Sequence, residues 1–314
     1  MNTDYYVDEK KDSWHIVYKG KTKISVYRLF PGILLGYNQI ETRELPMAPF
    51  TPFFRSEIVM RVNFSLAGIC EIRTKKGDYI YVKGGHVSIS SDKAAKGFSY
   101  PTGFYTGIEL YIQDEALKKP PDGFDPFGIV FGAIFSTYLR HQSTLSADMQ
   151  NELAPLAQSL HALLKKESPD LSQLRLYSLL VLRMLTAGAV VLNPEPISVL
   201  TPRQVECAKT ACEILTNQIS RRITIPEIAT QLGIGESSLK NWFRIVYGKS
   251  ISAYIRDLRI QTAKRLLADS DLTIFEIAGM VGYENQAKFT AMFHKYCGCT
   301  PSTYRRQYAD FSEK

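Results

Sequence analysis

The stretch TIPEIATQLGI (residues 224–234) returns 49 residues later as TIFEIAGMVGY (residues 273–283). After the glycine of each copy the match continues at an offset of 50, so that Phe243 corresponds to Phe293. An internal repeat of this kind indicates that one structural unit is built more than once in a chain. The C-terminal third therefore contains two similar small helical units.

Local rules predict a helix-turn-helix in each copy. Thr224 with Glu227, and Thr273 with Glu276, form the S/T-x-x-E pattern that caps the start of a helix. A glycine then ends each first helix, because glycine tolerates the left-handed backbone conformation. The apolar positions of the second helices are Leu239, Phe243 and Val246 in the first copy and Phe289, Phe293 and Tyr296 in the second. A short helix, a glycine turn and a second helix with a separate polar side are typical of DNA-binding helix-turn-helix units.

A long helix is predicted between the two copies, over residues 252–267 (SAYIRDLRIQTAKRLL). Its length is about 24 Å at roughly 1.5 Å per residue. With the helices at each end, two reading helices about 34 Å apart, one turn of DNA, are plausible. This is the geometry that one chain needs to reach two neighbouring stretches of DNA groove.

Residues 201–310 resemble the DNA-binding domain of the AraC/XylS family of transcription regulators. The segments that carry the resemblance are IPEIATQLGI, SLKNWFRIVYGKS, YIRDLRIQTAKRLL, LTIFEIAGMVGY and FTAMFHKYCGCTPSTYRR. The resemblance implies reading helices in successive major grooves, with operator DNA and RNA polymerase as partners. It also implies an effector-responsive transcription activator rather than an enzyme.

The resemblance and the helical spacing together indicate which side chains contact DNA. The polar side of the first reading helix carries Ser237, Lys240, Asn241 and Arg244. Matching family positions place base contacts at the first three, and we expect Arg244 to hold phosphate. The DNA-binding candidates on the second reading helix are Gln286, Ala287, Thr290, His294 and Lys295. Many family members have arginine where this chain has Ala291, so we expect the first copy to supply most of the sequence discrimination. The alternative is that these polar sides are merely solvated.

The charge of the chain agrees with a nucleic-acid partner. The sequence has 38 Lys and Arg against 31 Asp and Glu, and residues 201–314 hold 16 basic and 11 acidic residues, a net charge of +5. A basic excess in this third is what phosphate binding requires. The N-terminus shows no apolar signal segment, and the best apolar run, residues 176–192, is interrupted by Arg183. We expect a cytoplasmic protein with no membrane partner.

Residues 1 to about 113 have the pattern of short β-strands. Runs rich in β-branched and aromatic residues predict strands in KISVYRLF, ILLGYNQI, EIVMRVNFSL, CEIRT, DYIYV, HVSIS and GIELYI. Turns are predicted at Pro31-Gly32, Ala67-Gly68, Lys76-Gly77-Asp78 and Gly84-Gly85. Such a series suggests a sandwich or a small barrel. The resemblance implies a cupin-like β-barrel that binds a small-molecule effector, so the expected fold class is α+β.

A few polar and aromatic side chains are candidates for contacting the effector. Arg61, Asn63 and Arg73 are polar in otherwise apolar strands and could point into the barrel toward an anionic ligand, but alternation makes outward solvation equally compatible. Tyr100 and Tyr105 could line a pocket or belong to the core. The complete set of candidates is Arg61, Asn63, Arg73, His86, Tyr100 and Tyr105.

Metal chemistry is disfavoured by the pattern of histidines and cysteines. A metal-dependent cupin uses a His-x-His pair, whereas His86 stands alone in GGHVSIS and is better explained as a surface or hydrogen-bonded core histidine. Two of the five cysteines, Cys297 and Cys299, could bind a metal ion together with His294. Unpaired thiols in or near a helical core explain the cysteines better. No metal and no cofactor are therefore expected.

The alternative function, a DNA repair or modifying enzyme with an appended AraC-like domain, needs a cysteine cluster near the N-terminus, where only Cys70 lies.

The sensor segment has a resemblance of its own. VNFSLAGICEIRTKKGDYIYVKGGHVSIS and GFSYPTGFYTGIELYI are similar to the subset of these regulators that responds to iron siderophores and related secreted compounds. The effector expected from this resemblance is siderophore-like or another secreted metabolite.

The pattern turns helical from residue 146. One helix is predicted over residues 147–166, and a second begins at Ser168-Pro169 and continues to residue 192. The second is apolar on nearly every side, which predicts a homodimer through Leu174, Val181 and Leu185 unless one chain covers all its sides. The expected domains are a sensor (residues 1–145), a helical dimerisation segment (146–192), a linker (193–200) and the DNA-binding domain (201–314).

Overall fold

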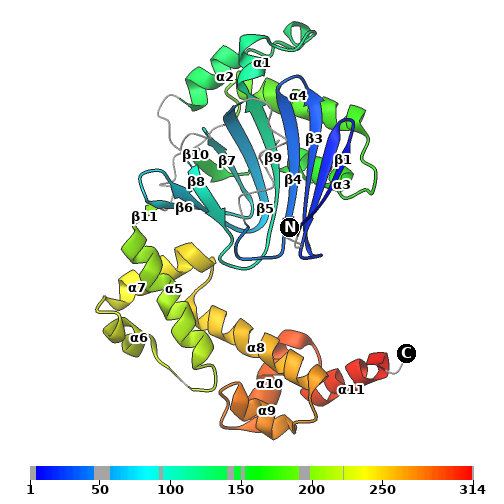
Figure 1. Cartoon of the computed structure of the whole chain (residues 1–314). Coiled ribbons are helices and arrows are strands. Elements are labelled where there is room, and N and C mark those ends of the chain that lie inside the picture. The colour runs from blue at the N-terminus through cyan, green and yellow to red at the C-terminus, as the bar shows by residue number, and fades with distance from the viewer. Residues whose placement is uncertain are drawn as a thin grey trace. The chain divides into compact units, whose positions relative to one another are not determined.

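The computed structural model describes residues 5–45, 57–91, 95–139, 145–149, 153–190, 199–221 and 223–312. The chain divides into two compact units, Met1–Pro202 and Arg203–Lys314. The N-terminal unit is built mainly from β-strands and the C-terminal unit from helices (Figure 1).

Eleven antiparallel strands form one sheet among the described residues of the N-terminal unit (Figure 1). They are β1 (Tyr5–Lys10), β2 (Ser13–Tyr18), β3 (Thr22–Phe30), β4 (Ile33–Ile40), β5 (Ile58–Thr74), β6 (Tyr79–Lys83), β7 (His86–Ser90), β8 (Ala95–Ser99), β9 (Tyr105–Gln113), β10 (Leu145–Asp148) and β11 (Val199–Leu200). Their order is β1-β2-β3-β4-β9-β5-β6-β11, while β7 and β8 also pair with β5, and β10 pairs with β7. All seven predicted strand segments lie within these strands to within one residue, and the β-rich N-terminal region is confirmed.

Strand β5 is long because it belongs to two parts of the sheet. Its first half pairs with β7, and its second half pairs with β6 and β8. The register against β9 shifts between Ser65 and Ala67, and Gly68 has a φ of +81°. The turn predicted at Ala67-Gly68 is therefore wrong, because the glycine serves an irregularity within one continuous strand.

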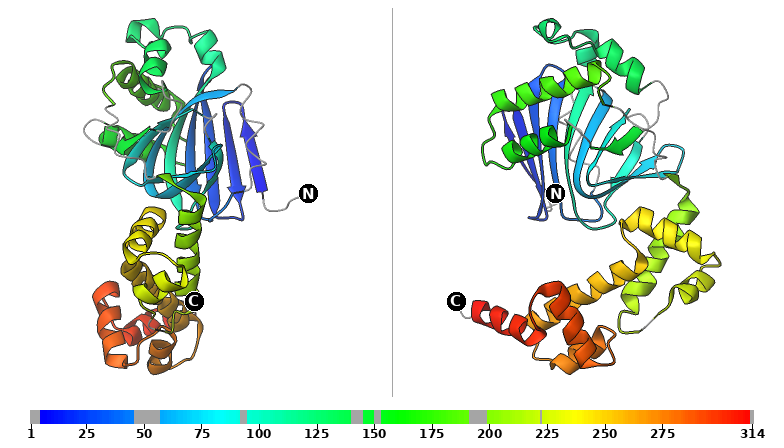
Figure 2. Two further views of the ribbon diagram at one scale, coloured as in Figure 1. Left: turned by 90° about the vertical axis from the view of Figure 1, so that its left-hand side faces the viewer. Right: turned by 180° about the vertical axis from the view of Figure 1, so that it is seen from behind.

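The two faces of the sheet carry separate cores. Helices α2 (Phe131–Tyr138), α3 (Leu153–Leu164) and α4 (Leu171–Thr186) pack on one face (Figure 2). On that face, Leu160 and Leu185 of the helices are fully buried, and each such burial contributes about 1.5–3 kcal/mol. The opposite face carries a second cluster of buried side chains that includes Trp14, Tyr105 and Tyr111.

The path through the described strands begins at β1 and ends at β11, and no pairing among them joins those two ends. A β-sheet region followed by a helical C-terminal domain is thus observed. Closure of the sheet into a cupin-like barrel stays a prediction.

The helices that follow the sheet begin later than the sequence suggested. Residues Leu145–Asp148 form strand β10 against β7, so residues 147–166 are not one helix. Pairing with a neighbouring strand has overridden the local helical pattern there. Helix α4 begins after Asp170, whose carboxylate accepts a hydrogen bond from the Ser172 amide at 2.8 Å, and not at Ser168-Pro169. It ends at Thr186, and the predicted break at residues 193–196 lies outside the described residues.

Short helical segments that the sequence pattern did not indicate follow β9. They are helix α1 (Asp114–Lys118) and the 3-10 turn η3 (Asp125–Phe127). Together with α2 they lie between residues 114 and 138, within the predicted sensor but after its predicted strands.

Seven helices form the described part of the C-terminal unit. They are α5 (Pro202–Asn217), α6 (Ile225–Gln231), α7 (Glu236–Tyr247), α8 (Ile251–Asp269), α9 (Ile274–Met280), α10 (Gln286–Cys297) and α11 (Pro301–Ser312). The pairs α6–α7 and α9–α10 are the two helix-turn-helix copies, and α8 is the predicted long helix between them (Figure 1). No helix in the described parts of the chain is both long and apolar enough to cross a membrane.

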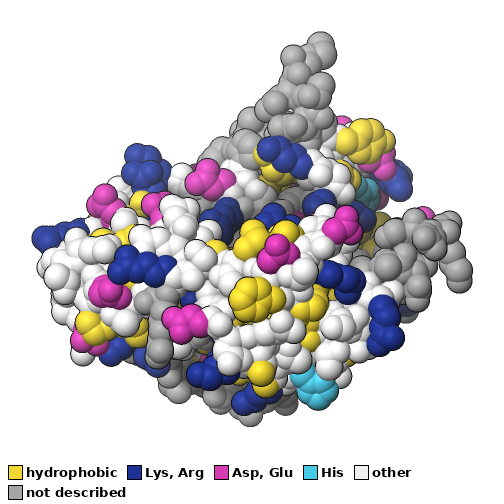
Figure 3. Space-filling view, turned by 90° about the horizontal axis from the view of Figure 1, so that it is seen from below, with side chains coloured by type: hydrophobic (Ala, Val, Ile, Leu, Met, Phe, Trp, Pro, Cys, Tyr) yellow, Lys and Arg dark blue, Asp and Glu magenta, His cyan; other side chains and the backbone are white. Residues whose placement is uncertain are grey.

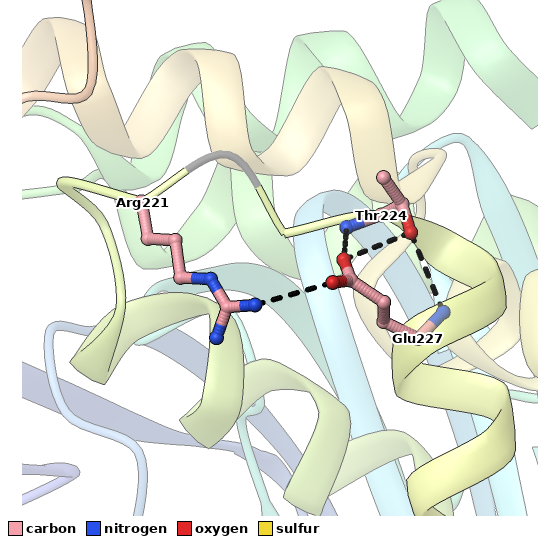
Figure 4. A network of polar contacts seen from close by, with 3 residues as sticks. All are labelled: Arg221, Thr224 and Glu227. Carbon is pink, nitrogen blue, oxygen red and sulfur yellow. Dashed lines mark hydrogen bonds and ion pairs between the residues drawn. The ribbon is translucent and has the colours of Figure 1, made fainter.

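Both predicted capping boxes are formed. Figure 4 shows Glu227 accepting a hydrogen bond from the Thr224 amide at 2.6 Å, with Arg221 3.2 Å from its other carboxylate oxygen. In the second copy Glu276 accepts from the Thr273 amide at 2.7 Å. These backbone hydrogen bonds, followed by those from the threonine hydroxyls, lower the pKa of both glutamates. Each first helix thus begins at the residue that the sequence indicated.

Candidate nucleic-acid interface

Helix α7 has a buried side and a polar side. Leu239, Phe243 and Val246 are fully buried, as their spacing predicts. The four residues predicted to contact DNA are exposed and lie at the i, i+3, i+4, i+7 spacing of one helical stripe: Ser237, Lys240, Asn241 and Arg244. Lys240 Nζ lies 3.0 Å from the carboxylate of Glu236. An exposed pair at this spacing contributes only about 0.3–0.5 kcal/mol, so the lysine can exchange this partner for DNA.

Helix α10 repeats the arrangement with a less polar stripe. Phe289 and Phe293 are fully buried, whereas Tyr296, predicted to be buried, is 45% exposed. That prediction is wrong because the ring lies on the surface beneath Arg256, whose guanidinium carbon is 4.7 Å from the ring centroid. Among the DNA-contact candidates, Thr290 is half-buried and the exposed ones are Gln286, Ala287, His294 and Lys295. Lys288 in the first turn is also exposed and was missed, although a basic residue next to the predicted stripe was the available signal.

The two reading helices begin differently. The N-cap of α7 is Gly235, which provides no side-chain hydrogen bond. The N-cap of α10 is Asn285, whose side chain accepts from the amides of Ala287 and Lys288 at 2.8 and 3.2 Å. Amide groups in the first turn of a helix are favourable partners for phosphate. The first-turn amides of α7 therefore have no side-chain cap that competes with a phosphate, whereas those of α10 do.

The surface seen in Figure 3 combines charge with a small apolar area. Lys and Arg side chains (dark blue) are distributed around a few hydrophobic ones (yellow), with acidic side chains between them. The exposed large hydrophobic residues in the described part of the C-terminal unit are Phe275, Met280 and Tyr296. Spaced cations around neutral contacts suit a phosphate backbone.

Part of the predicted effector set meets on the face of the sheet opposite helices α2, α3 and α4, which we call the inner face. Asn63 on β5 is buried and accepts a hydrogen bond from the Tyr105 hydroxyl at 2.8 Å. The Tyr100 ring lies 5.3 Å from the Tyr105 ring, measured between centroids. Burial is the main cause that raises the pKa of both tyrosines. Both phenols therefore stay neutral and can donate hydrogen bonds.

Arg61 lies on the same face but already has partners. Its guanidinium is 3.6 Å from the Glu109 carboxylate and lies over the rings of Phe98 and Tyr111, at 4.8 and 5.3 Å. A guanidinium neutralised in this way is a weak anchor for an anionic ligand. Glu109 was missed by sequence reasoning, although a glutamate between the apolar residues of β9 was a signal.

The remaining effector candidates lie elsewhere. Arg73 is exposed near the end of β5. His86 Nε2 is 2.9 Å from the Asp148 carboxylate, and its Nδ1 is 3.4 Å from the Gly84 carbonyl oxygen. The structure does not bring these two residues together with Asn63 and Tyr105 in one site.

The residues predicted to form a dimer are buried within the chain. Leu174, Val181 and Leu185 belong to the core between α4 and the sheet. The exposed apolar residues of α4 are Leu176 and Leu180, at 64% and 50% exposure. The assignment is corrected accordingly, because the side of α4 toward the sheet was mistaken for its free side.

The chain's cysteines are all free thiols, two of them half-buried and three buried. No group of three or more His, Cys, Asp or Glu side chains within the described residues could hold a metal ion.

Comparison with known proteins gives matches in the same C-terminal region. Residues 228–307 match the family model "Helix-turn-helix domain". The HTH-type transcriptional regulator ExsA of Pseudomonas aeruginosa is 37% identical over 82 residues, which cover 26% of this chain and 30% of ExsA. The virulence regulon transcriptional activator VirF of Yersinia enterocolitica is 29% identical over 182 residues, 56% of this chain and 65% of VirF. The matched part of the chain thus spans less than two thirds of either relative.

A solved structure gives a similar match. The crystal structure of a transcriptional regulator with an AraC-type DNA-binding domain from Chromobacterium violaceum is 23% identical, covers 33% of this chain and 93% of that one, and has a TM-score of 0.31. ExsA and VirF, by their names, are transcription regulators and not enzymes. By its duplicated helix-turn-helix, its capping boxes and these relatives, the C-terminal region of the chain is a helix-turn-helix domain of the kind found in AraC/XylS-type transcription regulators.

Proposed function

We propose that this protein is a sequence-specific DNA-binding regulator that activates transcription in response to a small molecule. The observation that carries the proposal is the pair of exposed reading stripes on α7 and α10, each opposite a fully buried core. A stripe of Lys, Asn and Arg offers the donors and acceptors that distinguish base edges in the major groove. The net charge of +5 over residues 201–314 supplies attraction to the phosphate backbone.

The DNA-binding proposal is tested by selection from random duplex DNA. The full chain is incubated with a pool of random duplexes, and the bound fraction is amplified and sequenced over several rounds. We expect one motif with two halves, because two reading helices differ in their exposed residues. The matched variant is Lys240→Ala with Asn241→Ala, which should lose the first half-motif and keep the second. Failure of the wild-type chain to enrich any motif above the starting pool would sink the proposal.

Activation is the finer part of this function, and it is supported by VirF, which is named as a transcriptional activator. The experiment is transcription in vitro with purified RNA polymerase on a template that carries the selected motif upstream of a weak promoter. More transcript with the protein than without it supports activation through the polymerase. Less transcript means that the protein represses, and this leaves the DNA-binding proposal intact.

The effector proposal rests on the N-terminal unit. The division proposed for the whole chain is a sensor (residues 1–145), a helical segment (146–192) that begins within strand β10, a linker (193–200) that ends in strand β11, and a DNA-binding domain (201–314). A cavity of about 360 Å³ opens where the β3–β4 turn meets α1 and α4. That volume is in the range of small-molecule sites, roughly 300–1,000 Å³. Its charged lining consists of Asp12, Arg28, Glu115 and Arg175.

The charge pattern of this cavity favours a small polar ligand that carries both a positive and a negative group. Arg28 lies over the Trp14 ring at 5.0 Å, and Arg175 Nε donates to the Leu29 carbonyl oxygen at 2.8 Å. Because Arg175 belongs to α4, a ligand bound in this cavity would contact the helix that carries the exposed Leu176. The siderophore-like effector expected from the sequence stays one candidate among such molecules.

The cavity and the inner face of the sheet can be distinguished by mass spectrometry of small molecules that co-purify with the chain. We expect Arg28→Gln to lose the co-purified molecule and Lys23→Gln, an exposed residue of the same strand, to keep it. Loss from Arg61→Gln but not from Arg28→Gln would place the effector on the inner face instead.

A further inference from the structure

The turns of the two helix-turn-helix copies have different surroundings, although both contain a glycine with positive φ. An added Cβ atom at Gly233 (φ +62°) would meet no heavy atom within 4 Å. At Gly282 (φ +80°) it would lie 2.5 Å from Arg259 Nη2 and 2.6 Å from the carbonyl oxygen of Ile219. The turn of the second copy therefore packs directly against α8 and against the segment that precedes the first copy, while the turn of the first copy is open.

Arg259 of α8 contacts the second copy and the segment that precedes the first copy. Its Nη2 donates to the carbonyl oxygen of Arg221, just before α6, at 3.1 Å. Its guanidinium carbon lies 5.6 Å from the ring centroid of Tyr283, just after the turn of the second copy. The Nε atom of Arg259 is buried. A hydrogen bond from a charged donor is about twice as strong as a neutral one, so this side chain firmly joins the second copy to the segment that leads into the first.

Two further cations of α8 make similar contacts, one with the second copy and one with α11. Arg256 lies over the Tyr296 ring at 4.7 Å, and Lys264 lies over the Tyr304 ring at 5.7 Å. Each such contact contributes about 0.5–1 kcal/mol or more when water is excluded. Helix α8 is thus bound to the second copy through Tyr283 and Tyr296 and to α11 through Tyr304. Among these three cations of α8, Arg259 also donates a hydrogen bond to the segment before the first copy.

We propose that Arg259 is a positioning residue that fixes the separation and angle of the two reading helices, so that the chain selects DNA with one spacing between its half-motifs. This inference rests on the proposed DNA-binding function. One additional base pair moves the second half-motif by about 3.4 Å along the DNA and roughly 35° around it. A rigid joint cannot follow that displacement, whereas a joint without Arg259 can rotate.

The experiment measures dissociation constants for the duplex selected by the wild-type chain and for duplexes with one base pair inserted or deleted between the half-motifs. We expect the wild-type chain to lose at least about tenfold in affinity on insertion or deletion, comparable to a mismatched base pair. Arg259→Ala should bind the original spacing more weakly and lose less than about threefold on insertion. Arg265→Ala, at an exposed arginine of the same helix, should keep the wild-type spacing penalty.

A pair of glycine variants tests the same joint from the other side. Gly233→Ala and Gly282→Ala both place a side chain at positive φ, but only the second displaces Arg259. We expect Gly282→Ala to reduce the spacing penalty and Gly233→Ala to retain it. Thermal unfolding followed by circular dichroism establishes which variants fold. Arg259→Lys keeps the charge over Tyr283 and is measured in place of any variant that does not fold. It should show an intermediate spacing penalty.

The possible failures are distinct. A wild-type chain that selects no two-part motif contradicts the proposed function itself. The inference is overturned if the wild-type chain shows a strong spacing penalty and both Arg259→Ala and Arg259→Lys fold and keep that penalty. This outcome leaves the proposed function standing.

Discussion

At the scale of single residues, the sharpest expectation concerns Asn241 on the polar side of α7. Its amide can pair with both the donor and the acceptor that adenine presents in the major groove. We expect Asn241→Ala to weaken binding to the preferred DNA by about 1–3 kcal/mol and to relax specificity at one base position. Alanine at Gln286 or Thr290 should relax specificity less, and the reverse order in a base-substitution series would contradict the dominance of the first copy.

Arg244 belongs to the same stripe, but we expect it to hold a phosphate. Arg244→Ala should then weaken binding by a similar factor on every sequence and lower the slope of log affinity against log salt by about 1. Titrations at several salt concentrations on preferred and scrambled duplexes measure both effects. A loss confined to the preferred duplex would assign a base contact to Arg244.

Thr224 and Thr273 carry the helix starts that the sequence predicted. Replacement of either threonine by alanine should cost about 1 kcal/mol of unfolding free energy, as loss of an N-cap generally does. The pKa values of Glu227 and Glu276 are lowered in the folded chain from the ordinary value of 4.5. Their stabilising effect is therefore present above about pH 4.5 and is lost as the pH falls through the lower folded pKa.

Denaturant unfolding of wild type, Thr224→Ala and Thr273→Ala at pH 7 and at pH 3 measures these effects together. We expect each variant to lose less stability on acidification than the wild-type chain. Loss of the threonine hydroxyl brings one glutamate pKa part of the way back to its ordinary value, while the backbone hydrogen bond remains. Equal losses in all three proteins would mean that the capping boxes do not contribute to the acid response.

At the scale of elements, we expect helix α4 to determine whether two chains associate. Leu176 and Leu180 form its exposed apolar side, and the side chains of Phe127 and Val130 are also exposed near its C-terminal end, where the Val130 amide donates to the Thr186 hydroxyl. We expect a dimer through this surface, since apolar patches of this kind mark interaction sites. Leu176→Glu with Leu180→Glu should then give a monomer in sedimentation, with unchanged thermal stability per chain.

The matched pair Val181→Glu and Leu185→Glu should unfold the N-terminal unit instead, because these side chains are buried against the sheet. A wild-type chain that sediments as a monomer at micromolar concentration, with and without DNA, would contradict the dimer.

The same elements show how far the sequence determines the fold. The helix-turn-helix copies could be predicted in detail, since caps, glycine turns and a 3.6-residue period are all local signals. Strand β5 and strand β10 could not, because a strand's extent depends on partners that are distant in the sequence. Tyr296 shows the limit within a helix, where spacing identified the core side for Phe289 and Phe293 but not the point at which the core ends.

The candidate sites follow the same division. The reading stripes could be found from the sequence because both sides of one helix are encoded in a dozen consecutive residues. The N-terminal candidates could not be assembled, since Arg61 meets Glu109 only through pairing of β5 with β9. The cavity lined by Asp12, Glu115 and Arg175 likewise joins segments more than 50 residues apart.

At the scale of the whole molecule, the chain's five histidines are dispersed. His15, His86 and His161 each have a hydrogen-bonding partner in the N-terminal unit, and His141 lies outside the described residues. Effector binding should therefore depend on shape and polar contacts, and treatment of the purified chain with a chelator should leave effector affinity unchanged. A large loss would contradict this, unless the effector is itself a metal complex.

The two copies follow one another along a single chain, with Lys, Asn and Arg exposed on one reading helix and Gln, Ala and His on the other. A DNA site bound by such a pair is asymmetric, unlike the palindromic sites that are bound by two identical helices. One chain therefore distinguishes upstream from downstream. Turning the same operator end for end should carry the N-terminal unit to the opposite side of the promoter, so that orientation as well as sequence enters the regulatory signal.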